Sequence, residues 1–473
     1  MARHSLIETD IGRHLIGGKS LNMDSRTVNT RESSRVRKSL QLYDRAKQLI
    51  AGRTHLFGRR AEMQALGVSP IYSERQLAGH FWDVDGHQYV DFNLGAGAVL
   101  LGHAYPSVVR AVADQAERGT GLSINHPLEI ETAELMSEIV PCAELVRFCK
   151  GGGEAAMVAV RIARAATGRD KVVFCGYHGW HDWYLAANLA SESTLEKHLL
   201  PGISPRGVPA QLEGTVLPFQ FNNVESLKKV LEAHRGQVAC VIMEAARTYL
   251  PQPGFLEAVR QLTHDQGVVL IFDEVVTGFR TARGGAQQHF GVIPDMATFA
   301  KCISNGFALG AVAGKREVME VAVDSFISSV YWAEATGLAA CRATLTEYLR
   351  QDVCGAVRHF GESFMESSSK LIEDSGVPAK VVGLPSFPAL SFQEKLPARL
   401  DAIVTLYMQE TAKRGLFGGP GHFFCLQHTE EDLRRSLEIM SETFKVIETA
   451  LRDGDVLKFL ECPVRQSGFR RLV

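Results

Sequence analysis

From about residue 107 onward, helical stretches alternate with short, mostly apolar strands. The clearest strands read LVRFCK (145–150), KVVFCG (171–176), VACVIMEA (238–245) and VVLIFDE (268–274), with segments of helical apolar spacing between them. Buried strands separated by helices are typical of a parallel sheet that is covered on its faces. The alternation therefore predicts an α/β fold with a mainly parallel central sheet wrapped by helices.

The remainder of the chain divides around this alternation. Residues 1–34 are polar and lack sustained periodicity, so we expect an N-terminal extension there. Residues 35–106 form an N-terminal segment with one early helix and a hairpin, HFWDVDGHQYVDF, that turns on Asp85-Gly86. We place the large domain at 107–340. Long amphipathic stretches such as 430–453 predict a smaller α+β domain at 341–473.

The charge balance and the cysteine pattern indicate which kind of partner the protein binds and in which cellular compartment it works. Lys and Arg (51) nearly balance Asp and Glu (53), so no global field attracts nucleic acid or an anionic membrane. We therefore expect small-molecule partners, no nucleic acid and no membrane. The nine cysteines show no CxxC pair, and no run of about 18 apolar residues or signal peptide is visible. These features predict a cytoplasmic protein.

Ligands of open α/β sheets bind outside the carboxyl ends of the strands, and two of these ends carry polar or glycine-rich motifs. Gly151, Gly152 and Gly153 follow the first strand and open a helix, which suits a phosphate group, although a glycine triplet is more often a tight turn. Tyr177 and His178 follow the second strand, and an aromatic ring there can stack on a planar ligand. His178 and His181 have HxxH spacing, but no third ligand accompanies them, so we expect no metal.

Two further strand ends carry charge. The apolar strand 268–272 ends in Asp273 and Glu274, and Lys301 lies among alanine, cysteine, isoleucine and phenylalanine. A lysine in such a setting is either a surface residue with a buried stem or a desolvated, reactive amine. Taken alone, the first interpretation is the more common one.

The four strand ends together match the requirements of pyridoxal 5'-phosphate. That cofactor needs a lysine for a Schiff base, a carboxylate on its pyridine nitrogen, a ring partner and a phosphate anchor. Asp273 would then keep the ring nitrogen protonated, and Glu274 would make structural hydrogen bonds or an ion pair. The sequence predicts a pyridoxal-phosphate enzyme.

The sequence also resembles the class III (subgroup II) aminotransferases of the fold-type I pyridoxal-phosphate enzymes over about residues 40 to 450. The motifs occur in the family's order: WDVDGHQYVDF, LLGHAYPSVV, GGGEAAMVAVRIARAATGRDKV, YHGWHD, FDEVVTGFR, PDMATFAKCISNGFALGAVAGKREVM and HTEEDL. The resemblance implies a homodimer with its active sites at the subunit interface. It also implies a role for each site residue: Lys301 as Schiff-base lysine and proton shuttle, Asp273 on the ring nitrogen, Tyr177 and Val275 on the two ring faces, and Gly152 and Gly153 at the phosphate.

The sequence departs from the family pattern mainly around the phosphate. Lys150 replaces an asparagine, and Gly151 and Gly153 replace residues that often carry hydroxyls. The family threonine that reaches the phosphate from the neighbouring subunit aligns with Val330, so we expect the nearby Ser329 to compensate.

Within the family, the chain looks closest to glutamate-1-semialdehyde aminomutases and related aminotransferases. Two mutase-specific charges are missing, because Pro420 and Gly58 stand where a glutamate and an arginine are expected. We therefore predict a two-substrate aminotransferase that takes nitrogen from an amino acid, glutamate first, and gives it to a keto sugar or aldehyde. The aminomutase is the alternative, and a module without chemistry is a third interpretation. Four substrate-binding residues are expected: Arg53, Arg247, Glu334 and His422.

Overall fold

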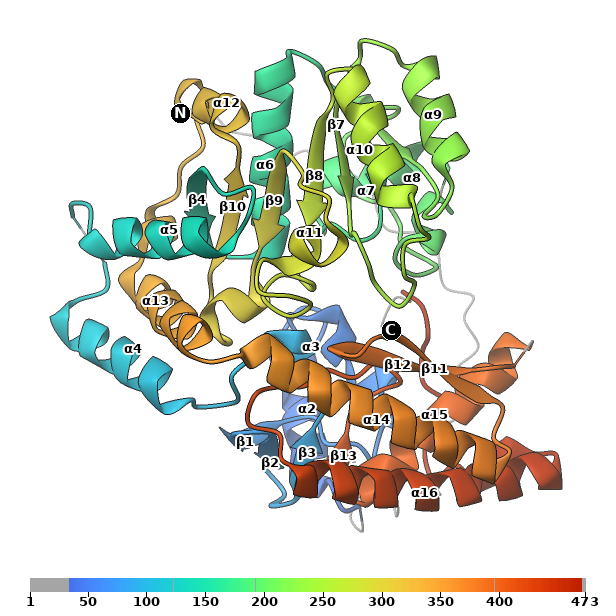
Figure 1. The fold of residues 1–473 in the computed structure, drawn as a ribbon. Coiled ribbons are helices and arrows are strands. Elements are labelled where there is room, and N and C mark those ends of the chain that lie inside the picture. Colours follow the sequence, from blue (N-terminus) through green and yellow to red (C-terminus); the bar gives the residue numbers. More distant parts are fainter. Residues whose placement is uncertain (1–33, 122, 192, 395, 470–473) are drawn as a thin grey trace, which may run out of the picture.

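The computed structural model describes residues 34–121, 123–191, 193–394 and 396–469. The predicted N-terminal extension lies outside these residues apart from Ser34. In Figure 1 the large central sheet occupies the upper half, and β1–β3 lie in the lower half with the elements that follow residue 353. No helix in the described ranges is long and apolar enough to cross a membrane.

The central sheet has seven strands in the order β4-β10-β9-β8-β7-β5-β6. All neighbours pair in parallel except β10, which is antiparallel to both β4 and β9. The prediction of a mainly parallel sheet is confirmed, and the antiparallel strand is an addition to it. The strands are β4 (Leu145–Cys149), β5 (Lys171–Cys175), β6 (Val216–Pro218), β7 (Val238–Met243), β8 (Val269–Asp273), β9 (Met296–Phe299) and β10 (Gly310–Gly314).

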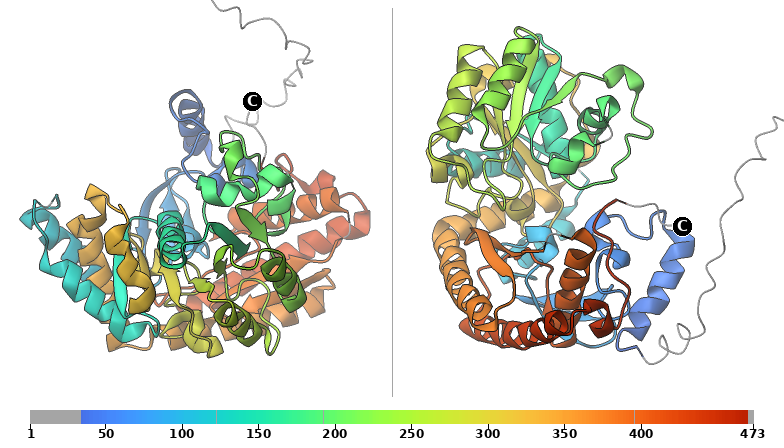
Figure 2. Two further views of the ribbon diagram at one scale, coloured as in Figure 1. Left: turned by 90° about the horizontal axis from the view of Figure 1, so that it is seen from above. Right: turned by 90° about the vertical axis from the view of Figure 1, so that its right-hand side faces the viewer.

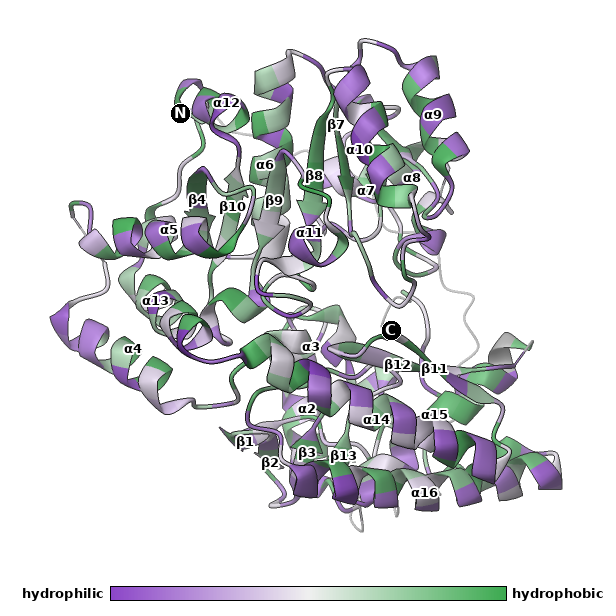
Figure 3. Cartoon of the chain, in the orientation of Figure 1, coloured by the Kyte–Doolittle hydropathy of each residue, from purple (hydrophilic) through white to green (hydrophobic). Residues whose placement is uncertain are grey.

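Helices cover this sheet because its central strands are apolar on both faces. Every residue of β7 and β8 is buried, and Figure 3 shows these strands in green, whereas α9, α10 and α16 alternate between purple and green. Such striping is the pattern of a helix with one buried face. The helices up to residue 350 are α2 (Arg37–Leu49), α3 (Leu94–Gly97), α4 (Pro106–Arg118), α5 (Pro127–Ile139), α6 (Gly152–Thr167), α7 (Asp182–Leu185), α8 (Ala187–Ala190), α9 (Val224–Ala233), α10 (Phe255–Asp265), α11 (Gly285–Phe290), α12 (Arg316–Met319) and α13 (Ala335–Arg350).

The N-terminal and C-terminal segments build one sheet together. The predicted hairpin forms as β2 (His80–Asp83) and β3 (Gln88–Asp91), with β1 (Ser73–Leu77) on one side and the distant β13 (Leu416–Phe417) parallel to β3 on the other. The right-hand view of Figure 2 shows blue α2 beside these orange and red C-terminal elements. The remaining elements are α14 (Val353–Ser375), β11 (Ala379–Leu384), β12 (Phe387–Phe392), α15 (Pro397–Lys413) and α16 (Glu430–Asp453).

The main apolar core runs through all three predicted parts of the chain. One cluster of buried side chains joins Leu100, Phe299, Phe364 and Met440. The boundaries proposed at 106/107 and 340/341 therefore cross a shared core, and they stay predictions.

Candidate active site

Five strands deliver their carboxyl ends to the same edge of the central sheet. Because β10 is antiparallel to both neighbours, β4 runs in the same direction as β9, β8, β7 and β5. The glycine triplet, Tyr177, Glu244, Asp273 and Lys301 all follow or terminate these strands. Residues separated by up to 150 positions thus meet at one edge, where open α/β sheets bind their ligands.

Lys301 begins the turn that follows β9. Its φ of 52° lies in the left-handed region, which a residue with a side chain adopts only when the surrounding structure requires it. Burial lowers the pKa of its amine, and the charges of Asp273 and Glu244 oppose that effect only in part. Within the described residues the amine makes no hydrogen bond, so it is a free, desolvated nucleophile.

Asp273 ends β8 and is 5% exposed. Its Oδ1 accepts a hydrogen bond from the backbone N–H of Val275 at 3.1 Å. Its Oδ2 lies 2.8 Å from Nδ1 of His178. These contacts hold the carboxylate in one orientation at the sheet edge.

His178 uses both ring nitrogens inside the protein. Nδ1 meets Asp273, and Nε2 lies 3.1 Å from the carbonyl oxygen of Cys175, which can only accept a hydrogen bond. His178 therefore orients the Asp273 carboxylate, a positioning role that the HxxH spacing did not indicate.

Glu244 follows β7 and was missed as a site residue. It is 7% exposed, and its Oε2 accepts the backbone N–H of Tyr177 at 3.0 Å. A Cβ at Gly176 would lie 2.6 Å from the same oxygen, and Gly176 has a φ of 108°. Glu244 and Gly176 thus fix the backbone that presents the Tyr177 ring.

Glu274 is turned away from this constellation. It is buried and accepts hydrogen bonds from the backbone N–H groups of Ala286 (2.7 Å) and Gln287 (3.1 Å) and from the Thr277 hydroxyl (2.8 Å). Burial raises its pKa, although these hydrogen bonds oppose the shift. The predicted structural role of Glu274 is confirmed, since it pins the loop that follows β8.

The glycine triplet brings other elements close to the N-terminus of α6. A Cβ at Gly152 would meet the Val275 methyl groups at 2.9 and 3.0 Å. A Cβ at Gly153 would meet the His181 ring, at 3.0 Å from Cε1 and 3.2 Å from Nδ1. Bare backbone at 152 and 153 therefore leaves the free N–H groups of the first helical turn beside Val275 and His181.

Two of the expected substrate residues are arginines in different situations. The Arg247 side chain is 46% exposed, and its side-chain hydrogen bonds within the described part of the chain are long, at 3.4 Å to Glu244 and to the His198 carbonyl oxygen. Arg53 instead forms a 2.6 Å ion pair with Glu62, and Glu62 also accepts the Tyr43 hydroxyl. Arg247 has spare donor capacity, whereas Arg53 is held by its neighbours.

The other expected residues differ in their relation to the strand ends, because Glu334 contacts the residue that follows β4 whereas His422 lies in the C-terminal core. Glu334 pairs with Lys150 at 2.9 Å and caps α13; burial raises its pKa, but hydrogen bonds from Thr336 and Lys150 outweigh that and hold it at about 2. His422 is 1% exposed between Phe92 and Phe364, and burial lowers its pKa to about 4. Ser329 is exposed on the surface of the chain.

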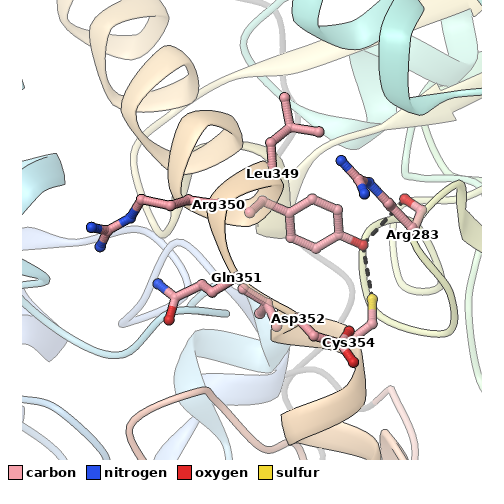
Figure 4. A pocket seen from close by; sticks show the side chains of 8 residues that line it. Arg283, Leu349, Arg350, Gln351, Asp352 and Cys354 are labelled. Atoms are coloured by element: carbon pink, nitrogen blue, oxygen red, sulfur yellow. Dashed lines mark hydrogen bonds between the residues drawn. The ribbon is translucent and has the colours of Figure 1, made fainter.

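Two cavities differ in their relation to the site. One of about 660 Å³ is lined by the N-terminal segment, including Arg53 and His103, and by Asn305 and Phe307, which closely follow Lys301. A smaller one of about 240 Å³ lies between Arg283 and residues 348–354 and contains none of the strand-end side chains (Figure 4). Neither cavity is lined by Tyr177, Asp273 or Lys301, but the larger one reaches Asn305 and Phe307 of the turn that follows Lys301.

The residues at the sheet edge fit pyridoxal 5'-phosphate. The site contains a free amine with a lowered pKa, a buried carboxylate at a strand end and an aromatic side chain. It also contains a helix N-terminus where a Cβ added to the glycines would clash with neighbouring side chains. His181 also has a buried Nδ1 with no hydrogen-bond partner among the described residues. The site therefore has the groups that the cofactor requires.

Comparison with known proteins agrees with this geometry. The family model for class-III aminotransferases matches residues 63–441. The 3-aminobutyryl-CoA aminotransferase of Cloacimonas acidaminovorans is 32% identical over 89% of this chain and 100% of its own length. The glutamate-1-semialdehyde 2,1-aminomutase of Methanocaldococcus jannaschii is 32% identical over 87% of this chain and 99% of its own. A transaminase solved with PLP bound has a TM-score of 0.79 and 27% identity, covering 88% of this chain and 99% of that one. This chain belongs to the class-III aminotransferase family.

Proposed function

We propose that this chain transfers an amino group from an amino acid donor, glutamate in the first instance, to a separate small carbonyl compound such as a keto sugar or an aldehyde. Membership of the family makes the chain a pyridoxal-phosphate-dependent aminotransferase. The observation that carries the proposal is the free, desolvated Lys301 amine at the same sheet edge as Asp273.

The side chains divide the work at the reacting centre. The bound cofactor supplies an electron sink for the carbanion that forms when the donor loses its Cα proton. Lys301 would hold the cofactor through its amine and would move that proton, a task that its lowered pKa favours. Asp273, oriented by His178, keeps a proton on the pyridine nitrogen. Tyr177 and Val275 confine the ring, and Gly152 and Gly153 face the phosphate.

Arg247 is our candidate for the group that binds the donor's carboxylate. It follows β7 by four residues and its charge acts on Tyr177, so it lies at the same edge as the ring partner. Its contact with Glu244 is long at 3.4 Å, which leaves guanidinium N–H groups for a ligand. The 660 Å³ cavity has the size that metabolite-sized ligands occupy, and we propose that the acceptor enters through it.

We further propose that the enzyme acts as a homodimer in which Ser329 of one subunit reaches the phosphate of the other. The stretch around Ser329 exposes apolar side chains, with Phe326 90% and Val330 81% exposed. Apolar groups clustered in this way mark a contact surface. Light scattering should give twice the chain mass, and a monomer at working concentration would refute the shared site.

The aminomutase remains the second candidate, because relatives with that name are 31 to 36% identical to this chain. The residues argue against it, since Pro420 and Gly58 carry no charge where the mutase pattern has a glutamate and an arginine.

A pair of experiments separates the candidates. First, the cofactor-loaded protein is mixed with single amino acids, and loss of its yellow absorbance band reports the donor half-reaction; glutamate should bleach the band. Second, glutamate 1-semialdehyde is supplied alone. Efficient formation of 5-aminolevulinate without an added donor would establish the mutase and overturn the aminotransferase proposal. If the protein shows no yellow band after incubation with the cofactor, the chain is a non-catalytic module.

A further inference from the structure

The N-terminus of α6 has no side-chain donors of its own for an anion. Residues 151–153 are all glycine, and Gly151 at the N-cap makes no side-chain hydrogen bond to the helix. The adjacent cation, Lys150, is engaged 2.9 Å from Glu334. The first helical turn also contains the acidic Glu154. A phosphate at this helix would rest on backbone N–H groups alone unless another element contributes.

The His181 side chain lies next to the N-terminus of α6, although it belongs to a different element. It lies in the loop between β5 and α7, and its ring occupies the space that a side chain at 153 would need. The atom nearest to that space is Cε1, at 3.0 Å from an added Cβ. Cε1 is bonded to both ring nitrogens, so the nitrogen-bearing edge of the imidazole faces Gly153. The Trp180 ring stacks on the His181 ring at a centroid distance of 4.7 Å.

The state of the ring also calls for a partner. Nδ1 is covered by protein atoms and makes no hydrogen bond within the described residues, so Nε2 is the ring nitrogen that a ligand can reach. Burial lowers the pKa of His181, although the nearby carboxylates of Glu154 and Asp182 oppose the shift. The ring is therefore neutral near pH 7 and has one N–H to donate.

We propose that His181 donates a hydrogen bond to the cofactor's phosphate at the N-terminus of α6, in the place of a hydroxyl at position 153. Gly153 and His181 then form one unit, because the glycine makes the room that the imidazole fills. The inference rests on the cofactor site proposed above and adds a phosphate ligand to it.

The first test compares two ligands that differ only in the phosphate. Apoprotein is titrated with pyridoxal 5'-phosphate and with unphosphorylated pyridoxal, and the absorbance of the lysine-bound form gives each Kd. His181→Ala should weaken binding of the phosphorylated ligand by roughly ten- to a hundredfold and leave pyridoxal binding within about twofold. His264→Ala, which removes an exposed histidine on α10, is the matched control and should change neither value. Equal weakening of both ligands, or of neither, overturns the proposal.

The second test exchanges the two members of the unit. Gly153→Thr alone should impair binding of the phosphorylated ligand, because its Cβ would lie 3.0 Å from the His181 ring. The double variant Gly153→Thr with His181→Ala provides both space and a hydroxyl, and it should bind the phosphorylated ligand more tightly than either single variant. A double variant no better than the weaker single one would contradict the coupling.

A third readout follows the bound phosphate directly. The ³¹P resonance of the cofactor bound to the wild-type chain should shift with pH as His181 gains its proton, and His181→Gln should remove that transition. A transition that persists in the Gln variant would overturn the proposal. These results leave the proposed reaction intact, whereas failure of the wild-type protein to bind pyridoxal 5'-phosphate would refute the cofactor site itself.

Discussion

The carboxyl-end edge of the central sheet and the joint sheet formed by the two chain ends differ in how their residues come together. At the sheet edge, Asp273 and Lys301 are placed by short strands whose direction follows from the βα alternation. In the joint sheet, β13 pairs with β3 more than 300 positions away, and the whole central sheet lies between them in the sequence. The first arrangement follows a general rule of parallel sheets, whereas the second depends on one specific long-range contact.

Arg280 shows how the two regions are connected. It is fully buried, and its guanidinium donates to the carbonyl oxygens of Gly97 (2.8 Å) and Phe424 (2.9 Å), which belong to the two chain ends. It also lies 3.1 Å from Sγ of Cys302, the neighbour of Lys301. A single side chain therefore joins the chain ends to the lysine turn, so chemistry and stability should respond differently to substitutions in the two regions.

The largest effect should come from Lys301→Ala at the sheet edge. The variant loses both the cofactor anchor and the proton-transferring group, and steady-state turnover should fall by roughly 10⁴-fold or more with unchanged circular dichroism. Substantial turnover in this variant would refute the site assignment.

Arg280→Met should mainly reduce stability. It leaves two buried carbonyl oxygens without a donor, so we expect the free energy of unfolding to fall by about 3–4 kcal/mol in a urea titration. Arg283→Met, three positions on and exposed, is the control and should change it by less than about 0.5 kcal/mol. Similar values for both variants would mean that the chain ends are held by other contacts.

Asp273→Asn should act on rate more than on stability. The substitution keeps the shape but removes the charge that His178 orients, and a loss of about 10²-fold or more in the half-reaction rate is expected. Glu274→Gln provides the comparison, because Glu274 binds the following loop and should affect the unfolding midpoint more than the rate. If Asp273→Asn mainly lowered stability and Glu274→Gln mainly lowered the rate, the roles assigned to these two carboxyl groups would be wrong.

The smallest effect should come from His422→Phe in the C-terminal core. Burial lowers the pKa of His422 to about 4 from an unfolded value of 6.5, so the unfolded chain binds the extra proton first as the pH falls. This histidine therefore lowers stability progressively between about pH 6.5 and pH 4, by roughly 2 kcal/mol at pH 5. The Phe variant should lose less stability than the wild type between pH 7.5 and 5 and keep its activity within about threefold. A large activity loss would restore His422 as a substrate residue.

The sequence predicted the parts of the site that depend on local pattern. The four named strands, the helices between them, the hairpin on Asp85-Gly86 and the helix at 430–453 all form close to the predicted bounds. The structural role of Glu274 was also anticipated, because two adjacent residues of a strand point to opposite faces. The roles of His178, Glu244 and His181 were not, since each depends on a partner from another strand or helix.

By itself, the sequence determined that this chain forms a helix-covered parallel sheet with a glycine turn, an aspartate and a lysine at its strand ends, and it identified the family. Backbone direction and apolar periodicity are local properties, so they can be read along the chain. Only the tertiary structure decided that Arg247 keeps free donors while Arg53 is paired with Glu62, that His422 is enclosed by Phe92 and Phe364, and that His181 fills the space over Gly153. Burial and pairing depend on which distant side chains come within a few ångströms, and that is set by how the elements pack rather than by their order.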